Sequence, residues 1–387
     1  MNESTFTPGG AQPGSVARGQ DPSGLKAVGS VAVHTFASHQ STSTTAHQSM
    51  DGHHVNAQAG EQGGYESTRL ADYDDLPDGH FYDPDAEYEP DPEYAATLAP
   101  DAARQRRERI GPTGRPLPYF PIPGPLNEHG PAKIIAMCNQ KGGVGKTTST
   151  INLGAALAEY GRRVLLVDFD PQGALSVGLG VNPMELDLTV YNLLMERGMA
   201  ADEVLLKTAV PNMDLLPSNI DLSAAEVQLV SEVARESTLQ RALKPLLADY
   251  DYIVIDCQPS LGLLTVNALT AAHKVIVPLE CEFFALRGVA LLTETIEKVQ
   301  ERLNPELELD GILATMYDSR TVHSREVLAR VVEAFDDHVY HTVIGRTVRF
   351  PETTVAGEPI TTYASNSVGA AAYRQLAREV LARCHAE

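Results

Sequence analysis

From residue 131 onward, short runs of consecutive apolar residues alternate with longer segments that have helical periodicity. Continuous apolar runs are typical of strands that are buried on both faces of a parallel sheet. We expect such strands at 133–138, 163–168, 214–217, 252–256, 274–279, 311–317 and 340–344. The segments between them predict helices, among them 146–160, 262–271, 285–303, 323–336 and 368–384. This alternation predicts a doubly wound, mostly parallel α/β domain over residues 131–387.

Residues 1–130 have a different composition, rich in Gly, Ser, Pro, Gln and His and poor in Ile, Leu and Val. Such a segment cannot bury enough apolar surface to offset the entropy lost on ordering, so we expect a disordered tail and linker. Within it, residues 71–94 carry ten acidic side chains and no Lys or Arg, residues 104–109 read RQRRER, and residues 111–125 are rich in Pro and Gly. Both a solvated spacer and a partner-binding or regulatory segment fit this pattern.

The charge of the chain limits how it can bind nucleic acid. The formal net charge is −21, with about 18 acidic and 8 basic residues in 1–130 and about 33 and 22 in 131–387. Binding through bulk positive charge is therefore excluded, and any DNA contact must use a local basic patch. The absence of a secretory signal, of a run of ~18 apolar residues and of a CxxC pair predicts a cytoplasmic protein with reduced thiols.

A glycine-rich loop follows the first predicted strand. The phosphate-loop pattern G-x-x-x-x-G-K-[ST] is met from Gly145 to Thr147, but Gln140 stands where the first glycine is expected. Glycines permit positive φ and allow backbone N–H groups to face phosphate oxygens, and a helix N-terminus adds partial positive charge. We expect Lys146 to reach the β- and γ-phosphates of ATP and the Thr147 hydroxyl to ligate Mg²⁺. The residues expected to bind the nucleotide are Gly142, Gly143, Val144, Gly145, Lys146, Thr147 and Thr148.

Two further predicted strands end in carboxylates. The strand at 163–168 ends with Asp168, and Asp170 follows on the same side of an extended chain. Four apolar residues precede Asp256, which is the Walker B arrangement for holding Mg²⁺ through water. Ligands of such sheets bind at the carboxyl ends of the strands, so we expect these acids to lie beside the glycine-rich loop.

These motifs resemble the ParA/MinD group of P-loop ATPases, which carry a deviant Walker A motif, K-G-G-x-G-K-[ST]. Residues 151–180, 250–292 and 311–321 are similar to its chromosomal ParA (Soj) branch, and the resemblance covers about 132–384. It implies that Gln140 does not disable the loop. It also implies that Lys141 reaches the nucleotide of a second copy in an ATP-sandwich homodimer.

The same resemblance implies roles for individual acids and for one arginine. Asp170 would orient the attacking water, Asp168 would support the Mg²⁺ site and Asp256 would be the Walker B acid. Arg320 falls where this branch has an arginine that contacts nonspecific DNA. The resemblance further implies a slow ATPase, stimulated by a ParB-like partner, that associates with the nucleoid and acts in chromosome segregation.

The sequence departs from the pattern of the Soj branch in three places. Gln258 replaces a proline, Ala174 replaces an asparagine, and Gly345 and Thr347 replace a proline and an asparagine near the adenine or the DNA surface. The candidate catalytic residues Lys141, Lys146 and Asp170 are intact, so we expect ATP binding. The local basic patch is expected to comprise Arg320, Arg346 and Arg349.

Three other functions remain open from the sequence. A MinD-like switch that positions another cargo or acts at the membrane would need a basic amphipathic C-terminal helix; residues 371–387 instead predict a helix that packs on the core, so we expect no membrane partner. A bacterial tyrosine kinase would share the loop and have a tyrosine-containing tail. A reductase of the nitrogenase iron-protein type would need cysteines that hold a cluster between two subunits.

Overall fold

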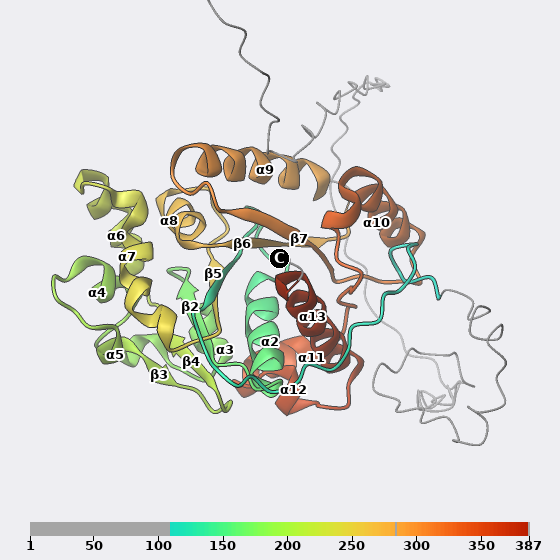
Figure 1. The fold of residues 1–387 in the computed structure, drawn as a ribbon, viewed down its shortest axis with the longest axis horizontal. Helices are drawn as coiled ribbons and strands as arrows, with labels where there is room; N and C mark the ends of the chain where they lie inside the picture. The colour runs from blue at the N-terminus through green and yellow to red at the C-terminus, as the bar shows by residue number, and fades with distance from the viewer. Residues whose placement is uncertain (1–108, 283–284, 386–387) are drawn as a thin grey trace, which may run out of the picture. The chain divides into compact units, whose positions relative to one another are not determined.

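The computed structural model describes residues 109–282 and 285–385, so most of the predicted disordered tail, residues 1–108, lies outside the described residues. The described residues form a seven-stranded sheet with the order β3-β4-β2-β5-β1-β6-β7 (Figure 1). β3 pairs antiparallel with β4, and all other pairs are parallel. The strands are β1 Lys133–Met137, β2 Val164–Phe169, β3 Leu206–Lys207, β4 Met213–Leu216, β5 Tyr252–Cys257, β6 Lys274–Glu280 and β7 Glu308–Thr315. The predicted doubly wound fold is confirmed.

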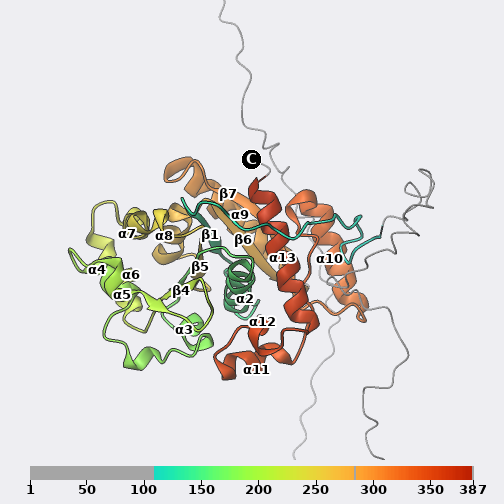
Figure 2. The ribbon, with the colours of Figure 1, turned by 60° about the horizontal axis from the view of Figure 1, so that its bottom comes forward.

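Helices cover both faces of the sheet (Figures 1 and 2). Apolar side chains of α2, α12 and α13 pack with Ile135 and Met137 of β1. Those of α4 and α6–α10 belong to the cluster on the opposite face, which contains Ile134 and Ala136 of the same strand. Successive residues of a strand point to opposite faces, so a strand covered on both sides must be apolar throughout. This explains the continuous apolar runs.

The long predicted helices are present, with ends shifted by at most one residue. Several short helices were not predicted, because four to eight residues are too few to establish a helical period. The α-helices are α2 Lys146–Glu159, α3 Ala174–Gly178, α4 Val190–Met195, α5 Ala201–Val204, α6 Leu222–Gln228, α7 Thr238–Leu243, α8 Leu263–Ala271, α9 Ala285–Arg302, α10 Val322–Phe335, α11 Arg349–Ala356, α12 Ile360–Tyr363 and α13 Val368–His385. None of the helices among the described residues is both long and apolar enough to cross a membrane.

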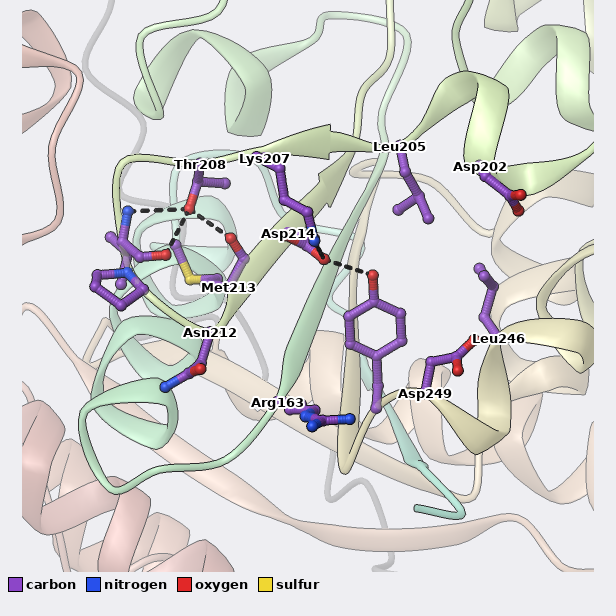
Figure 3. Close-up of a pocket in the computed structure, with 13 residues that line it drawn as sticks. Arg163, Asp202, Leu205, Lys207, Thr208, Asn212, Met213, Asp214, Leu246 and Asp249 are labelled. Carbon is purple, nitrogen blue, oxygen red and sulfur yellow. Dashed lines mark hydrogen bonds and ion pairs between the residues drawn. The ribbon is translucent and has the colours of Figure 1, made fainter. Parts of the chain in front are cut away.

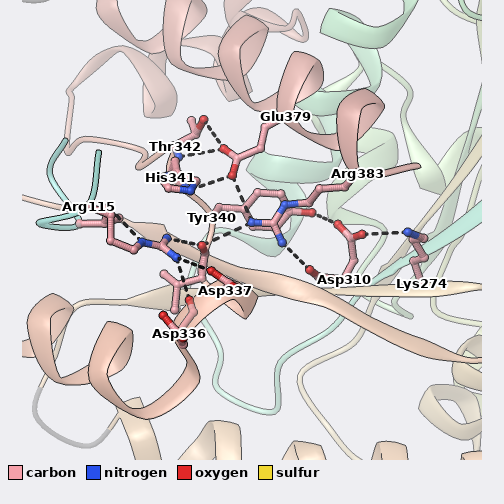
Figure 4. A network of polar contacts seen from close by, with 12 residues as sticks. Arg115, Lys274, Asp310, Asp336, Asp337, Tyr340, His341, Thr342, Glu379 and Arg383 are labelled. Atoms are coloured by element: carbon pink, nitrogen blue, oxygen red, sulfur yellow. Dashed lines mark hydrogen bonds and ion pairs between the residues drawn. The ribbon is translucent and has the colours of Figure 1, made fainter. Parts of the chain in front are cut away.

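The predicted strand at 340–344 is wrong. Only isolated bridges occur here, and they flank the segment: Val339 pairs with Ile312 of β7, and Gly345 pairs with Tyr317. The backbone N–H groups of His341 and Thr342 donate to the carboxylate of Glu379 on α13, at 2.8 and 2.9 Å, so they cannot join a ladder (Figure 4). β7 also begins and ends earlier than the predicted 311–317.

Residues 109–130, expected as linker, contact the α/β domain. The guanidinium of Arg115 donates to the carbonyl of Asp336 at 2.8 Å. The ring Nδ1 of His129 lies 2.7 Å from a carboxylate oxygen of Asp251, just before β5. No motif in the sequence indicated these contacts, and the domain boundary at 130 stays a prediction.

Candidate functional site

The carboxyl ends of β1, β2 and β5 meet at one edge of the sheet. In the strand register, Met137 of β1 lies opposite Asp256 of β5, and Asp256 lies opposite Asp168 of β2. β1 leads directly into the glycine-rich loop, so the loop and both acids are adjacent, as the sequence predicted.

The glycine-rich loop takes the conformation of a phosphate-binding loop. Gly143 and Gly145 have φ of 75° and 85°, in the left-handed region that glycine tolerates. Gly142, which we expected to share this conformation, does not have positive φ, so that expectation is wrong for this residue. Gly145 caps α2, whose first residue is Lys146. The Lys146 ammonium is buried and donates to the carbonyl of Lys141 at 3.1 Å, across the mouth of the loop.

Thr147 and Asp256 are in direct contact. The Thr147 hydroxyl donates to a carboxylate oxygen of Asp256 at 2.6 Å. Burial raises the pKa of Asp256 to about 8, and the neighbouring Asp168 adds to the shift, although the bond from Thr147 opposes it. A hydroxyl and a carboxylate are hard oxygen ligands of the kind that Mg²⁺ prefers.

Asp168 is fully buried beside this pair. The backbone N–H and the hydroxyl of Ser176 donate to one of its carboxylate oxygens, at 2.8 and 2.7 Å. Burial nevertheless raises the pKa of Asp168 to about 6. Two buried carboxyls that both resist ionisation are a fitting place for a divalent cation, because its charge would stabilise both anions.

Asp170 lies just after the end of β2 and is half-buried. One of its carboxylate oxygens accepts a hydrogen bond from the backbone N–H of Gln172 at 2.9 Å, within the turn that leads to α3. This turn holds the carboxylate at the same edge of the sheet as the loop.

Lys141 does not contact the loop through its side chain. Its ammonium lies 3.0 Å from Glu280 and 2.6 Å from Glu282, which end β6 and follow it. Partial burial lowers the pKa of Lys141, but the bonds to Glu282 and Glu280 outweigh burial and the pKa is raised overall. The side chain remains 44% exposed.

A cavity of about 340 Å³ opens beside the loop. Gly145 and Thr148 form one side of it. Segments 315–316 and 344–354, which include Gly345 and Thr347, supply the rest together with Tyr373 of α13. Its walls are mostly apolar, which suits a nucleotide base. A second cavity, of about 610 Å³, lies near β3 and β4 and involves none of the predicted site residues (Figure 3).

The three arginines expected to contact DNA are exposed, and each forms an ion pair. The pairs are Arg320–Asp318 at 3.0 Å, Arg346–Glu280 at 3.4 Å and Arg349–Glu352 at 3.0 Å. These carboxylates reduce the positive charge that the arginines present.

Sequence reasoning missed three polar residues that support the site. The side chain of Asn139 donates to the carbonyl of Pro278 at 2.7 Å and accepts from the backbone of Lys141. Ser176 holds Asp168, and Thr315 donates to the carbonyl of Val144 at 2.8 Å. None belongs to a spaced motif, so no signal in the sequence marked them.

Known proteins resemble this chain over the same region. A protein-family profile described as an AAA domain matches residues 132–309. An uncharacterised protein of Mycobacterium tuberculosis is 69% identical over 274 residues, which cover 71% of this chain and 86% of that protein. The sporulation initiation inhibitor protein Soj of Bacillus subtilis is 48% identical over 65% of this chain and 98% of its own length. The chromosome partitioning protein ParA of Caulobacter vibrioides is 48% identical over 65% of this chain and 95% of its own.

Solved structures agree with these relatives. A Mycobacterium smegmatis protein described as cobyrinic acid a,c-diamide synthase, with bound ADP and magnesium, is 46% identical with a TM-score of 0.59, over 66% of this chain and 96% of that one. The cell division ATPase MinD of Pyrococcus furiosus is 28% identical with a TM-score of 0.54, over 65% of this chain and 99% of that one. The near-complete coverage of Soj and ParA, at almost half identity, shows that the chain belongs to the ParA/Soj family of P-loop ATPases.

Proposed function

We propose that this protein is an ATP-driven dimerisation switch of the ParA type, which binds DNA without sequence preference in its ATP state. The observation that carries the proposal is the arrangement at the sheet edge. A phosphate-binding loop lies over two buried acids, while a second loop lysine, Lys141, is turned away from its own loop. Once it leaves Glu280 and Glu282, a lysine so placed could serve the nucleotide of another copy.

Within one subunit, the loop and α2 bind ATP with Mg²⁺. The N–H groups of residues 142–148 and the Lys146 ammonium hold the phosphates, and Lys146 exchanges the Lys141 carbonyl for a phosphate oxygen. Thr147 and Asp256 would hold the metal, and the neighbouring Asp168 would add negative charge to the site. Mg²⁺ supplies neutralisation of the phosphate charge. Asp170 orients the water that attacks the γ-phosphate.

Lys141 completes the site of a second subunit. A positive charge beside the transferring phosphate stabilises the charge of the transition state, and it does so more strongly where a closed interface excludes water. Hydrolysis is therefore slow in the monomer and depends on the dimer. ATP binding would therefore assemble the dimer, and ATP hydrolysis would let the two subunits separate.

In the ATP state, the dimer binds DNA through the patch Arg320, Arg346 and Arg349. The three side chains are exposed, and arginine contacts of this kind can be made to phosphates rather than bases. DNA binding in the ATP state would associate the protein with the nucleoid during chromosome segregation, and a ParB-like protein would stimulate hydrolysis and so release the dimer. Two relatives are named as chromosome partitioning proteins, which supports this role.

A DNA-binding titration with and without ATP tests the function. Fluorescence anisotropy of a labelled duplex of arbitrary sequence should rise with Mg-ATP and stay low with ADP. The affinity should fall steeply as salt increases, because phosphate contacts release counterions. Equal binding with ATP, with ADP and without nucleotide would contradict the proposal.

The alternatives receive no support from the described residues. A MinD-like membrane function would need a free C-terminal helix, but α13 contributes Tyr373, Leu376 and Val380 to the apolar core. Amide transfer, the reaction in the description of the M. smegmatis protein, would need a nucleophile to release ammonia from glutamine. Cys138, Cys257 and Cys281 are buried among the described residues, and Cys384 is half-buried.

A further inference from the structure

Thr315 links β7, the outermost strand of the sheet, to the phosphate-binding loop through a hydrogen bond. It is the last residue of β7 and is 2% exposed. Its hydroxyl donates to the carbonyl oxygen of Val144 at 2.8 Å, across 171 positions of sequence. A Cβ placed on Gly145 would lie 3.8 Å from the Thr315 methyl, so the two residues are also packed together.

This hydrogen bond fixes the direction of one peptide group in the loop. In a trans peptide, the C=O and the following N–H point in opposite directions. Since the Val144 carbonyl is held toward Thr315, the N–H of Gly145 must point away from it, toward the space that phosphates would fill. Thr315 thereby orients a phosphate-binding N–H without touching the nucleotide.

The residues after Thr315 lead to the arginine patch. Met316 has φ of 50°, which ends β7 and turns the chain. The backbone of Tyr317 then forms two hydrogen bonds with the segment 344–346. Its N–H donates to the carbonyl of Ile344, and its carbonyl accepts from the N–H of Arg346, each at 3.0 Å. Arg320 follows three residues later.

Resting on the proposed function, we propose that Thr315 is a positioning residue that transmits the state of the phosphate-binding loop to the arginine patch. Phosphates that bind the loop N–H groups act on the Val144–Gly145 peptide, and Thr315 is its partner on the opposite side. Any shift of that peptide reaches segments 315–320 and 344–349 through the hydrogen bond of Thr315, the backbone of residues 315–317 and the two hydrogen bonds of Tyr317. All three arginines of the patch lie on these two segments.

Two substitutions at Thr315 separate the hydroxyl from packing. Thr315→Val keeps the shape but leaves the Val144 carbonyl without its donor, whereas Thr315→Ser keeps the donor. Thr208→Val is the matched control, because the Thr208 hydroxyl also donates to a backbone carbonyl, that of Met213 at 2.6 Å, near the opposite edge of the sheet (Figure 3).

The first measurement is the affinity for fluorescent ADP in the presence of Mg²⁺. We expect Thr315→Val to bind about tenfold more weakly, because an unsatisfied buried carbonyl disfavours the oriented loop. The ADP affinity of Thr315→Ser should stay within about threefold of that of the wild type, and the affinity of Thr208→Val should equal that of the wild type. Wild-type affinity in Thr315→Val, or equal losses in the Val and Ser variants, would overturn the positioning role.

The second measurement is the gain in DNA affinity on adding ATP, at concentrations that saturate each variant. The ratio of the DNA affinity with ATP to that without ATP should be at least about threefold smaller in Thr315→Val than in the wild type. In Thr315→Ser this ratio should equal that of the wild type. A full gain in the valine variant would overturn the transmission. If wild-type DNA binding does not respond to ATP, the proposed function fails instead, while the ADP measurement still decides whether Thr315 positions the loop.

Discussion

Asp168 and Asp256 lie directly opposite each other on the neighbouring strands β2 and β5, and both side chains are buried. Two ionised carboxylates in this position would repel each other in a medium that solvates them poorly. Burial raises the pKa of Asp168 to about 6 and that of Asp256 to about 8, and the charge of Asp168 adds to the shift of Asp256. The pair is therefore a source of instability until a cation binds.

This relationship predicts that the metal-free protein becomes more stable as the pH falls from 8.5 toward 6. The folded pKa of each acid is raised above its unfolded value of about 3.9, so the folded state binds more protons in this range and stability decreases as the pH rises. Thermal unfolding in EDTA should show a higher Tm at pH 6 than at pH 8.5. Asp256→Asn should weaken this dependence, and an unchanged pH profile in that variant would contradict the assignment.

Removal of the Lys141 ammonium should separate binding from turnover. Lys141→Ala leaves Lys146, Thr147 and the loop N–H groups in place, so we expect fluorescent ATP to bind within about threefold of the wild type. ATPase activity and the ATP-dependent dimer should both be lost, since the missing charge would have served the other subunit. Lys207→Ala changes an exposed lysine of β3, the outermost strand on the far side of the sheet, and should behave as wild type. Persistent dimerisation of Lys141→Ala with ATP would exclude the cross-subunit role.

The ion pairs of Lys141 should oppose dimerisation. Lys141 must leave Glu280 and Glu282 to reach another subunit, and each exposed pair is worth roughly 0.2–1 kcal/mol. The double variant Glu280→Gln, Glu282→Gln should therefore dimerise with ATP at a protein concentration about threefold to tenfold lower, as measured by sedimentation. Glu159→Gln, which removes the partner of Arg374, is the control. A higher concentration requirement would mean that these acids assist the closed dimer instead.

The arginine patch makes a distinct prediction about salt. Arg320→Ala should weaken DNA binding in the ATP state and reduce the slope of log affinity against log salt by about 1.8, the value for two lost phosphate contacts, one from each subunit of the dimer. Its ATPase activity without DNA should be unchanged, because Arg320 pairs with Asp318 and does not line the cavity beside the phosphate-binding loop. A loss of affinity with the same salt slope would indicate that Arg320 does not contact DNA phosphate.

The sequence was informative where function depends on local spacing and uninformative where it depends on tertiary contacts. The loop from Gly142 to Thr148 and Asp256, the penultimate residue of β5, could be predicted, because each motif lies within one turn or one strand. The contact of Thr315 with Val144 could not, since it joins residues 171 positions apart. The segment at 340–344 has the composition of a strand, but Glu379 binds its N–H groups, and only the folded chain brings these residues together.

The central claim, that ATP joins two subunits, is tested most directly by the mass of a variant that cannot hydrolyse its nucleotide. Asp170→Ala should bind ATP and retain it, and light scattering after gel filtration should give about twice the 41.7 kDa of one chain with Mg-ATP, but the mass of one chain without nucleotide. If Asp170→Ala carries bound ATP and still has the mass of a single chain, the dimerisation switch is contradicted.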